Sequence, residues 1–306
     1  MKLVALAGGV GAAKFLSGLV RVLPPEVLTI IVNTGDDFRW QGLHISPDLD
    51  TIIYTLAGLS NPETGWGIQG DSFHCLARLK ALGCDTWFQV GDRDLATHIY
   101  RTDRLRSGTS LTEVTYCLRR MNGVEARVLP MTDSFVPTQV HTDEGAMHLQ
   151  EYFVRRKCEP RVTGFTFQGI EAAKPAPGVL EAIGAASTII VCPSNPFISV
   201  NPILAVPGVR ESLRHRTVIA VSPIIAGRSI KGPTAVMLAQ MGHEVSAVSV
   251  AEMYRDFADI FVLDHLDAAL QTRVSSLGMK ARIAATLIDS DEAKIALARS
   301  VLEMVG

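Results

Sequence analysis

The sequence predicts an α/β protein built on a doubly wound, mainly parallel β-sheet. One observation is a β-α-β unit at the N-terminus, where the apolar runs 2–7 and 27–33 flank a helical segment that ends before Pro24-Pro25. The other is a return of alternating strands and helices from residue 188 onward. Because a strand–helix–strand order favours parallel pairing, we expect both stretches to contribute to one Rossmann-like sheet.

The Ser46-Pro47 pair predicts the start of the next helix, which runs to about Leu59, since serine is favoured at the N-cap and proline at the first helical position. In residues 60–122, apolar residues recur at three- and four-residue spacing, which is typical of amphipathic helices. Helices are expected at 71–82, 93–105 and 110–121, with one short strand at 86–90. We therefore predict a mainly helical insertion, 60–122, over the sheet edge of a core formed by 1–59 and 123–306.

Apolar, β-branched runs predict the remaining strands. Four of them alternate in polarity and are interpreted as antiparallel or edge strands: 125–130, 136–142, 147–154 and 161–167. Five more continue the alternation of strands and helices: 188–192, 217–221, 244–248, 261–263 and 282–284. A helix near 291–304 is expected to end the chain.

The composition restricts the class of protein. Hydrophobic residues make up 47% of the chain, which indicates a substantial core, and 29 basic against 31 acidic residues argue against nucleic-acid or membrane binding through bulk charge. No apolar run is long enough to span a bilayer, and the N-terminus does not resemble a signal peptide. The five cysteines include no C-x-x-C pair, so a reducing, cytoplasmic location is expected.

A glycine loop follows the first predicted strand. Gly8, Gly9 and Gly11 precede a helical pattern in which Lys14 lies one turn along. Backbone N–H groups and the positive end of a helix dipole favour a phosphate at such a place. The loop resembles the dinucleotide fingerprint, but Lys14 replaces the third glycine, and the ending of a Walker A loop is missing. A tight structural turn is the alternative.

Four carboxylates are expected at the same edge of the sheet, because ligands of parallel sheets bind at the carboxyl ends of the strands. Asp36 and Asp37 follow the second strand, and Asp48 and Asp50 lie in the first turn of the next helix. Carboxylates beside a phosphate site are typical magnesium ligands. Asp48 could instead complement the helix dipole, and residues two apart on a helix do not face each other, so we favour Asp50 as the functional member.

Three more loops carry polar residues at predicted strand ends. In Gly91–His98, Arg93 could hold a phosphate, but Asp92 and Asp94 could equally be helix N-terminal acids paired with it, and His98 is interpreted as a packed or capping residue. The other two loops, Cys192–Ser199 and Ser222–Pro233, add amide, hydroxyl and basic groups. Such polar loops at one sheet edge favour a binding site.

Several strings in this chain together resemble the 2-phospho-L-lactate transferase family: Gly8–Lys14, Asn33–Asp37, Ile45–Thr51, Gly91–His98, Ser194–Pro196 and Ser222–Ile224. The resemblance covers essentially the whole chain. It implies transfer of a phospho-acid from a guanosine diphosphate ester to the ribityl hydroxyl of the deazaflavin FO, with release of GMP, in coenzyme F-420 biosynthesis. It also implies magnesium as cofactor and a homodimer. The acid could be 2-phospho-L-lactate, phosphoenolpyruvate or 3-phosphoglycerate.

The resemblance also implies residue roles. Catalytic roles fall to Asp50 and Arg93, and metal binding falls to Asp50, Asp48 and Asp37. Substrate binding is expected of Gly8, Gly9, Gly11, Lys14, Asp50, Gln89, Asp92, Ser194 and Asn195. Among these, Gln89 stands where relatives are expected to have a lysine that contacts FO, and Ser194 and Asn195 are expected near the guanosine.

Two other functions stay open at this point. One is an NAD(P)-dependent oxidoreductase, against which the replacement of the third glycine by Lys14 and the Asn33-Thr34 end of the second strand both argue. The other is a nucleotide-sensing regulator of the same fold, against which the intact Ser46–Asp50 string argues. Binding of FO without binding of NAD would favour the transferase.

Overall fold

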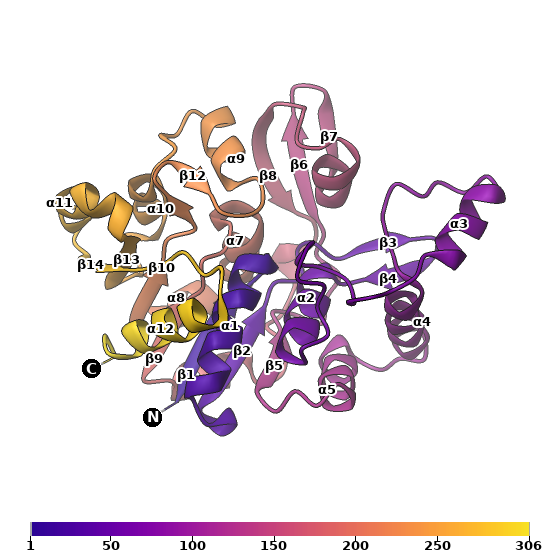
Figure 1. The fold of residues 1–306 in the computed structure, drawn as a ribbon, viewed down its shortest axis with the longest axis horizontal. Helices are drawn as coiled ribbons and strands as arrows, with labels where there is room; N and C mark the ends of the chain where they lie inside the picture. The colour runs from indigo at the N-terminus through magenta and orange to yellow at the C-terminus, as the bar shows by residue number, and fades with distance from the viewer. Residues whose placement is uncertain (1, 306) are drawn as a thin grey trace.

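The computed structural model describes residues 2–305, and its centre is a seven-stranded sheet in which every neighbouring pair is parallel (Figure 1). The order is β14-β13-β10-β9-β1-β2-β5. The strands are β1 (Leu3–Ala7), β2 (Leu28–Val32), β5 (Arg127–Pro130), β9 (Thr188–Val191), β10 (Thr217–Val221), β13 (Ile260–Asp264) and β14 (Lys280–Ala284). This confirms the α/β class. Read from the other edge, the order β5-β2-β1-β9-β10-β13 is that of a dinucleotide-binding sheet, and β14 is one further strand.

Both faces of the sheet are buried, which explains the continuous apolar runs. In β1, Val4 and Leu6 pack in one hydrophobic cluster, while Leu3, Ala5 and Ala7 pack in another on the opposite face. The second cluster lies against α1 (Gly9–Val22), α2 (Pro47–Leu56), α5 (Leu111–Met121) and α12 (Asp291–Leu302). The first lies against α6 (Val179–Ala185), α7 (Asn201–Ala205), α8 (Val209–Leu213), α9 (Thr234–Gln240) and α10 (Ala247–Tyr254).

Smaller elements surround the carboxyl ends of the strands (Figure 1). A hairpin of β3 (Phe38–Trp40) and β4 (Leu43–Ile45) packs with α3 (His74–Ala81) and the loop before α4 (Asp92–Arg106). An antiparallel sheet contains β7 (Gly145–His148), β6 (Thr138–Thr142) and β8 (Val162–Phe167), in that order. The remaining elements are β11 (Ile224–Ile225), β12 (Arg228–Ser229) and α11 (Gln271–Ser275), π-helical turns at Glu151–Arg155 and Pro196–Val200, and 3-10 turns at Pro25–Val27, Ile170–Ala172 and His265–Leu270.

Residues 60–122 supply α3, α4 and α5 and add no strand to the central sheet. The helix α3 packs outside the main core, and α5 shares the cluster of α1 and α2. The helix α4 contacts both groups, because Leu95 packs with the β3–β4 hairpin while Tyr100 and Leu105 pack against the main cluster. The boundary of the insertion therefore stays a prediction. Within residues 2–305, no helix combines the length and the apolar character that crossing a bilayer requires.

The strand predicted at 244–248 is wrong. The Ser246 hydroxyl accepts a hydrogen bond from the Ser249 N–H at 3.4 Å and caps α10, so Val248 and Val250 are buried residues of a helix. Their β-branched side chains suggest a strand, but the cap and the packing decide the conformation.

Two other predicted strands differ from the structure. The strand expected at 86–90 is irregular chain, because Trp87 and Phe88 pack against the ring of Phe38 without joining a sheet. The strand expected at 147–154 ends at His148 and continues into the π-helical turn. In both stretches the aromatic and apolar residues that indicated a strand are used for side-chain packing instead.

Candidate active site

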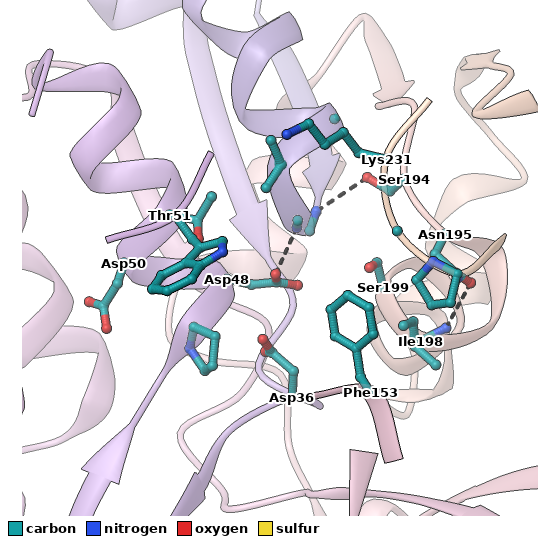
Figure 2. A pocket seen from close by; sticks show the side chains of 18 of the residues that line it. Asp36, Asp48, Asp50, Thr51, Phe153, Ser194, Asn195, Ile198, Ser199 and Lys231 are labelled. Carbon is teal, nitrogen blue, oxygen red and sulfur yellow. Dashed lines mark hydrogen bonds between the residues drawn. The ribbon is translucent and has the colours of Figure 1, made fainter. Parts of the chain in front are cut away.

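A cavity of about 470 Å³ lies at the carboxyl ends of β1 and β9. Chain order reverses there, because β1 is followed on one side by β2 and bordered on the other by β9. Ligands of open α/β sheets bind at such a point. Figure 2 shows that its walls come from sequence-distant segments, with Asp48 and Asp50 on one side and Ser194, Asn195 and Ser199 on the other.

The glycine loop forms the floor of the cavity and is bonded to both walls. The Gly8 N–H donates to Oγ of Ser194 at 3.3 Å, and the Gly9 N–H donates to Oδ1 of Asp48 at 2.7 Å. Gly9 has φ of +75°, which suits glycine. A Cβ on Gly8 would lie 2.5 Å from Oδ2 of Asp48, and one on Gly11 would lie 2.5 Å from the Pro193 carbonyl oxygen. The glycines therefore allow the close approach of the two walls.

The loop differs in one respect from the simple phosphate site that the sequence predicts. The N-terminus of α1 already has an anion, because the Asp48 carboxylate accepts from its first N–H. Lys14, further along α1, lines the same cavity. Burial lowers its pKa, and the positive charge of Lys231 on the opposite loop lowers it further. An anion bound between these two lysines would relieve their repulsion.

Two carboxylates face each other beside the glycine loop. Asp36 and Asp48 are both buried and both line the cavity (Figure 2). The Asn33 amide links them, donating to Oδ2 of Asp48 at 2.9 Å and more weakly to Oδ1 of Asp36 at 3.5 Å. Desolvation raises the pKa of Asp48 to about 6 and the pKa of Asp36 well above its ordinary value, which the Asp48 charge raises further. Carboxylate oxygens of this kind are hard ligands that suit a divalent cation such as magnesium.

This pair predicts that the metal-free protein loses stability as the pH rises. A carboxylate whose pKa is higher in the folded than in the unfolded state binds protons more tightly when folded, so stability falls between about pH 4 and pH 6. The pKa of Asp48 rises from 3.8 to about 6 on folding, which corresponds to a loss of about 3 kcal/mol in the free energy of unfolding across this pH range. Chemical unfolding in EDTA at pH 5 and pH 7 measures it. Asp48→Asn should reduce the dependence; an unchanged profile would contradict this assignment.

Asp37 lies elsewhere, although it was predicted to bind metal. Its Oδ2 accepts from the Ser46 hydroxyl at 2.9 Å and lies 2.8 Å from Nε2 of His44. It is absent from the cavity lining, where Asp36 stands instead. The Ser46 hydroxyl thus bonds Asp37 and does not cap α2, although Pro47 occupies the first turn as predicted. Gly35 and Asp36 form a turn that is closed by the Asp37 N–H donating to the Thr34 carbonyl at 3.2 Å, and in this turn Asp36 rather than Asp37 lines the cavity.

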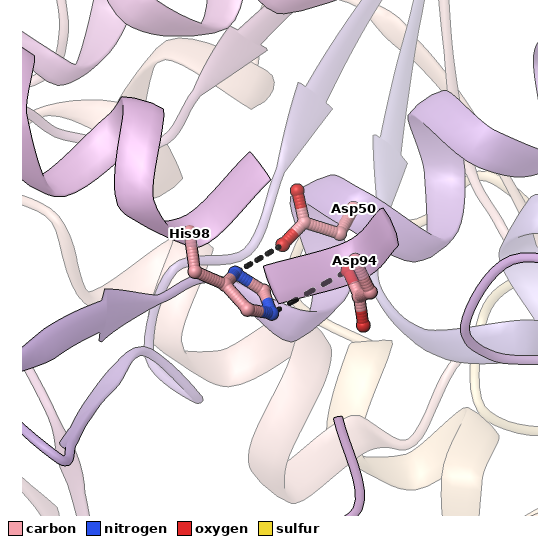
Figure 3. A group of neighbouring side chains, drawn as sticks. All are labelled: Asp50, Asp94 and His98. Atoms are coloured by element: carbon pink, nitrogen blue, oxygen red, sulfur yellow. Dashed lines mark ion pairs between the residues drawn. The ribbon is translucent and has the colours of Figure 1, made fainter. Parts of the chain in front are cut away.

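Asp50 lines the cavity but contacts different residues from Asp48. Its Oδ1 accepts from Nη2 of Arg101, and its Oδ2 lies 3.6 Å from Nδ1 of His98. Figure 3 shows His98 between Asp50 and Asp94, with its Nε2 3.4 Å from Oδ1 of Asp94. Asp48 and Asp50 both line the cavity, so the expectation that residues two apart on this helix would not both face one site is wrong.

Three other predicted residues lie at the margin of the site or outside it. Gln89 lines the cavity, and its amide donates to the Thr86 carbonyl at 3.3 Å. Asp92 accepts from the Ser72 hydroxyl and from two backbone N–H groups, so it organises the loop before α3. Arg93 donates to the Gly70 carbonyl at 2.7 Å, and its side chain is 60% exposed. Asp92 and Arg93 do not line the cavity.

Ser194 and Asn195 lie in the loop after β9, and both line the cavity. The side-chain Oδ1 of Asn195 accepts from the Phe197 N–H at 2.9 Å and caps the π-helical turn, and the side-chain Nδ2 of Asn195 donates to the Met237 sulfur at 3.3 Å. Asn195 is therefore a structural cap as well as a lining residue. The Ser199 side chain from the same turn reaches the cavity.

Apolar side chains also line the cavity. They come from β4, the loop before α3, the segment before α4 and the chain after β7: Ile45, Trp66, Phe88, Leu149, Phe153 and Val154. The cavity thus offers both charged groups and aromatic surface. This combination suits a ligand with an aromatic ring system and a charged chain.

Glycines, buried carboxylates and two lysines at the reversal point of a doubly wound sheet define a protein that binds phosphorylated compounds. The family model "2-phospho-L-lactate transferase CofD" matches residues 3–300. The chain belongs to this CofD family of transferases. The "2-phospho-L-lactate transferase" of Methanosarcina mazei is 41% identical over 301 residues, covering 98% of this chain and 99% of that protein.

Other similar proteins carry other names. The "Phosphoenolpyruvate transferase" of Streptomyces griseus is 41% identical over 314 residues, covering 99% of this chain and 98% of that protein. The crystal structure of a upf0052-family member from Bacillus halodurans has a TM-score of 0.62 at 15% identity, covering 98% of both chains, and it shares the fold.

Several residues in or beside the cavity have no role assigned from the sequence. Asn33 contacts the lining residues Asp36 and Asp48. Asp94 and His98 line the cavity, whereas the sequence predicts a helix-end and a packed residue. Their i, i+4 spacing on α4 was a usable signal, because it places both on one face of the helix. The contact of Arg101 with Asp50 spans 51 positions and has no local signal.

Proposed function

We propose that this protein transfers a three-carbon phospho-acid from a guanosine diphosphate ester to the ribityl hydroxyl of FO and releases GMP, a step of coenzyme F-420 biosynthesis in the cytoplasm. The observation that carries the proposal is that one cavity combines a charged, glycine-rich floor with aromatic side chains in its lining. The glycine loop with Lys14 and Lys231 suits the donor phosphates. The aromatic side chains suit the flat ring system of a deazaflavin.

The acid is 2-phospho-L-lactate or one of its close analogues, phosphoenolpyruvate and 3-phosphoglycerate. Names of similar proteins support the first two, since relatives of nearly equal identity are called 2-phospho-L-lactate transferase and phosphoenolpyruvate transferase. A methyl and a methylene group differ little in transfer free energy, so one or two side chains suffice to set the preference. The family resemblance also supports a homodimer.

The residues present fit magnesium. Asp36 and Asp48 offer buried carboxylate oxygens beside the phosphate-binding floor, and burial raises the pKa of both. These two would hold the ion, with the donor phosphates as further ligands. Asp50 stays a predicted ligand, whereas Asp37 is engaged with His44 and Ser46. When bound, magnesium would neutralise charge on the phosphates.

The reaction needs no covalent enzyme intermediate. The hydroxyl oxygen of FO attacks the phosphorus that carries the acid, and the bond from this phosphorus to the GMP oxygen breaks. Oδ2 of Asp50 is placed to accept the hydroxyl proton, since Asp50 lines the cavity and this oxygen has no hydrogen-bond partner within residues 2–305. Lys14 and Lys231 stabilise charge on the leaving phosphate, so positioning and electrostatics supply the rate.

Mass spectrometry of the product tests this proposal. The enzyme is incubated with FO, magnesium and each of the three guanosine donors in turn. One donor is expected to give an FO phosphodiester and an equal amount of GMP, and EDTA should stop the reaction. Absence of product with all three donors, together with binding of NAD, would favour the oxidoreductase. Binding of FO or guanine nucleotide without turnover would favour the regulator.

A further inference from the structure

One oxygen of the Asp50 carboxylate accepts a hydrogen bond, and the other lies 3.6 Å from Nδ1 of His98 without accepting one. Oδ1 accepts from Nη2 of Arg101. Oδ2 is buried, and no residue of the described chain donates a hydrogen bond to it. A buried acceptor without a donor is costly, and Asp50 lines the cavity, so a hydroxyl of a bound ligand is the donor that this oxygen lacks.

Arg101 is itself fully buried, which is rare for arginine. It lies on α4 and does not line the cavity. Its Nη1 is 3.2 Å from Nδ1 of His98 and 3.4 Å from the His44 carbonyl oxygen. A planar guanidinium bonded at both ends cannot rotate without breaking contacts, so it fixes the orientation of the Asp50 carboxylate.

A chain of side chains supports Arg101 from behind. His98 accepts from Arg101 at Nδ1 and turns Nε2 toward Asp94 at 3.4 Å (Figure 3). Asp94 in turn accepts from the Tyr54 hydroxyl at 2.8 Å. The members come from α2 and α4, so this contact network also fixes the two helices relative to each other.

The same cluster has the composition of a metal site, but its charges favour another role. Ligand atoms of Asp50, Asp94 and His98 lie within 4.8 Å of one another. The Arg101 guanidinium contacts both Asp50 and His98, so a positive charge already balances the carboxylates. A divalent cation at this place would be repelled by it.

We infer that Arg101 is a positioning residue, which orients Asp50 so that its free oxygen receives the hydroxyl of the acceptor. The inference rests on the proposed function for the identity of that hydroxyl. Arg101 does not touch the ligand and acts only through Asp50. It lies in the segment 60–122, so this segment contributes to the reaction as well as to the wall of the cavity.

The test compares Arg101→Lys, Arg101→Met, Asp50→Asn and the double variant Asp50→Asn/Arg101→Met, with kcat and KM measured for each. Lysine keeps the charge but cannot make both contacts, so kcat should fall about 100-fold while KM for the donor changes little. In the Asp50→Asn background, Arg101→Met should cause no further loss of kcat, because its effect passes through Asp50. Arg104→Lys, on the exposed side of α4, is the matched control.

Thermal unfolding of the same variants separates this inference from the proposed function. Arg101→Met should lower the unfolding midpoint more when Asp50 is present than in the Asp50→Asn background. Only with Asp50 present does the substitution leave a buried carboxylate unpaired. If the wild type makes no product, the proposed function fails, and this coupling alone decides whether Arg101 holds Asp50. Three results would each overturn the inference. They are near-normal kcat in Arg101→Lys, a further full loss of kcat when Arg101→Met is added to Asp50→Asn, and an equal effect of Arg101→Met on the unfolding midpoint in both backgrounds.

Discussion

Asp50→Asn is expected to lower kcat for phospho-acid transfer by about 10²–10⁴-fold, the usual contribution of a general base. Asparagine keeps the volume and still accepts from Arg101, but it cannot take up the hydroxyl proton. Binding of FO should change little, because the aromatic side chains that line the cavity are intact. Steady-state kinetics with FO and the accepted donor, with a fluorescence titration of FO, measure the two effects separately.

The amide is preferable to alanine as a test. Asp50→Ala would leave Arg101 buried without its partner, at a cost of roughly 3–5 kcal/mol, so lost activity could reflect unfolding. Asp103→Asn is the control, since this residue is exposed on α4. Asp50→Asn with more than about a tenth of the normal kcat would remove Asp50 as the base and leave it a role in binding.

Gly8→Ala is expected to lower transfer activity by about 100-fold, because the new methyl group displaces groups at the floor of the cavity. Its Cβ would lie 2.5 Å from Oδ2 of Asp48 and 2.8 Å from Cβ of Ser199. The clash should also lower stability by about 1–3 kcal/mol, as overpacking does. Activity assays at saturating donor and urea unfolding measure both changes.

Gly184→Ala is the matched control for Gly8→Ala. Gly184 lies in α6, away from the cavity, and nothing stands within 4 Å of the Cβ that alanine would add. Alanine there should keep full activity and stabilise the helix by up to about 1 kcal/mol. If Gly8→Ala behaves like this control, Gly8 does not set the distance between Asp48 and the loop, and the description of the floor is wrong.

The sequence predicts the central sheet well and its surroundings less well. Buried parallel strands such as β1 and β9 are continuous apolar runs bounded by glycine or proline, and this signal is local. The strand prediction for 244–248 is wrong because the Ser246 cap of α10 outweighs the strand preference of the β-branched residues around it. Trp87 and Phe88 pack on Phe38, which lies far earlier in the sequence, and no local pattern reports such a contact.

For the candidate site, the sequence predicts which segments meet but not which side chains point inward. Asp48 and Asp50 both line the cavity, and the glycine loop contacts the first of them. Which of Asp36 and Asp37 faces the cavity depends on the backbone conformation between them, and residue spacing does not determine that conformation. The contacts of Arg101 depend on how α4 docks against α2, a tertiary property.

The bond between Gly8 and Ser194 joins residues 186 positions apart. Ribosomal synthesis delivers the N-terminal β-α-β unit early, yet the floor of the cavity remains open until the strand β9 has emerged and paired with β1. High contact order of this kind slows folding. Binding of the donor would stabilise this late-formed contact. A nucleotide analogue should therefore protect the amides of β1 and β9 together from hydrogen exchange, although the two strands lie far apart in the sequence.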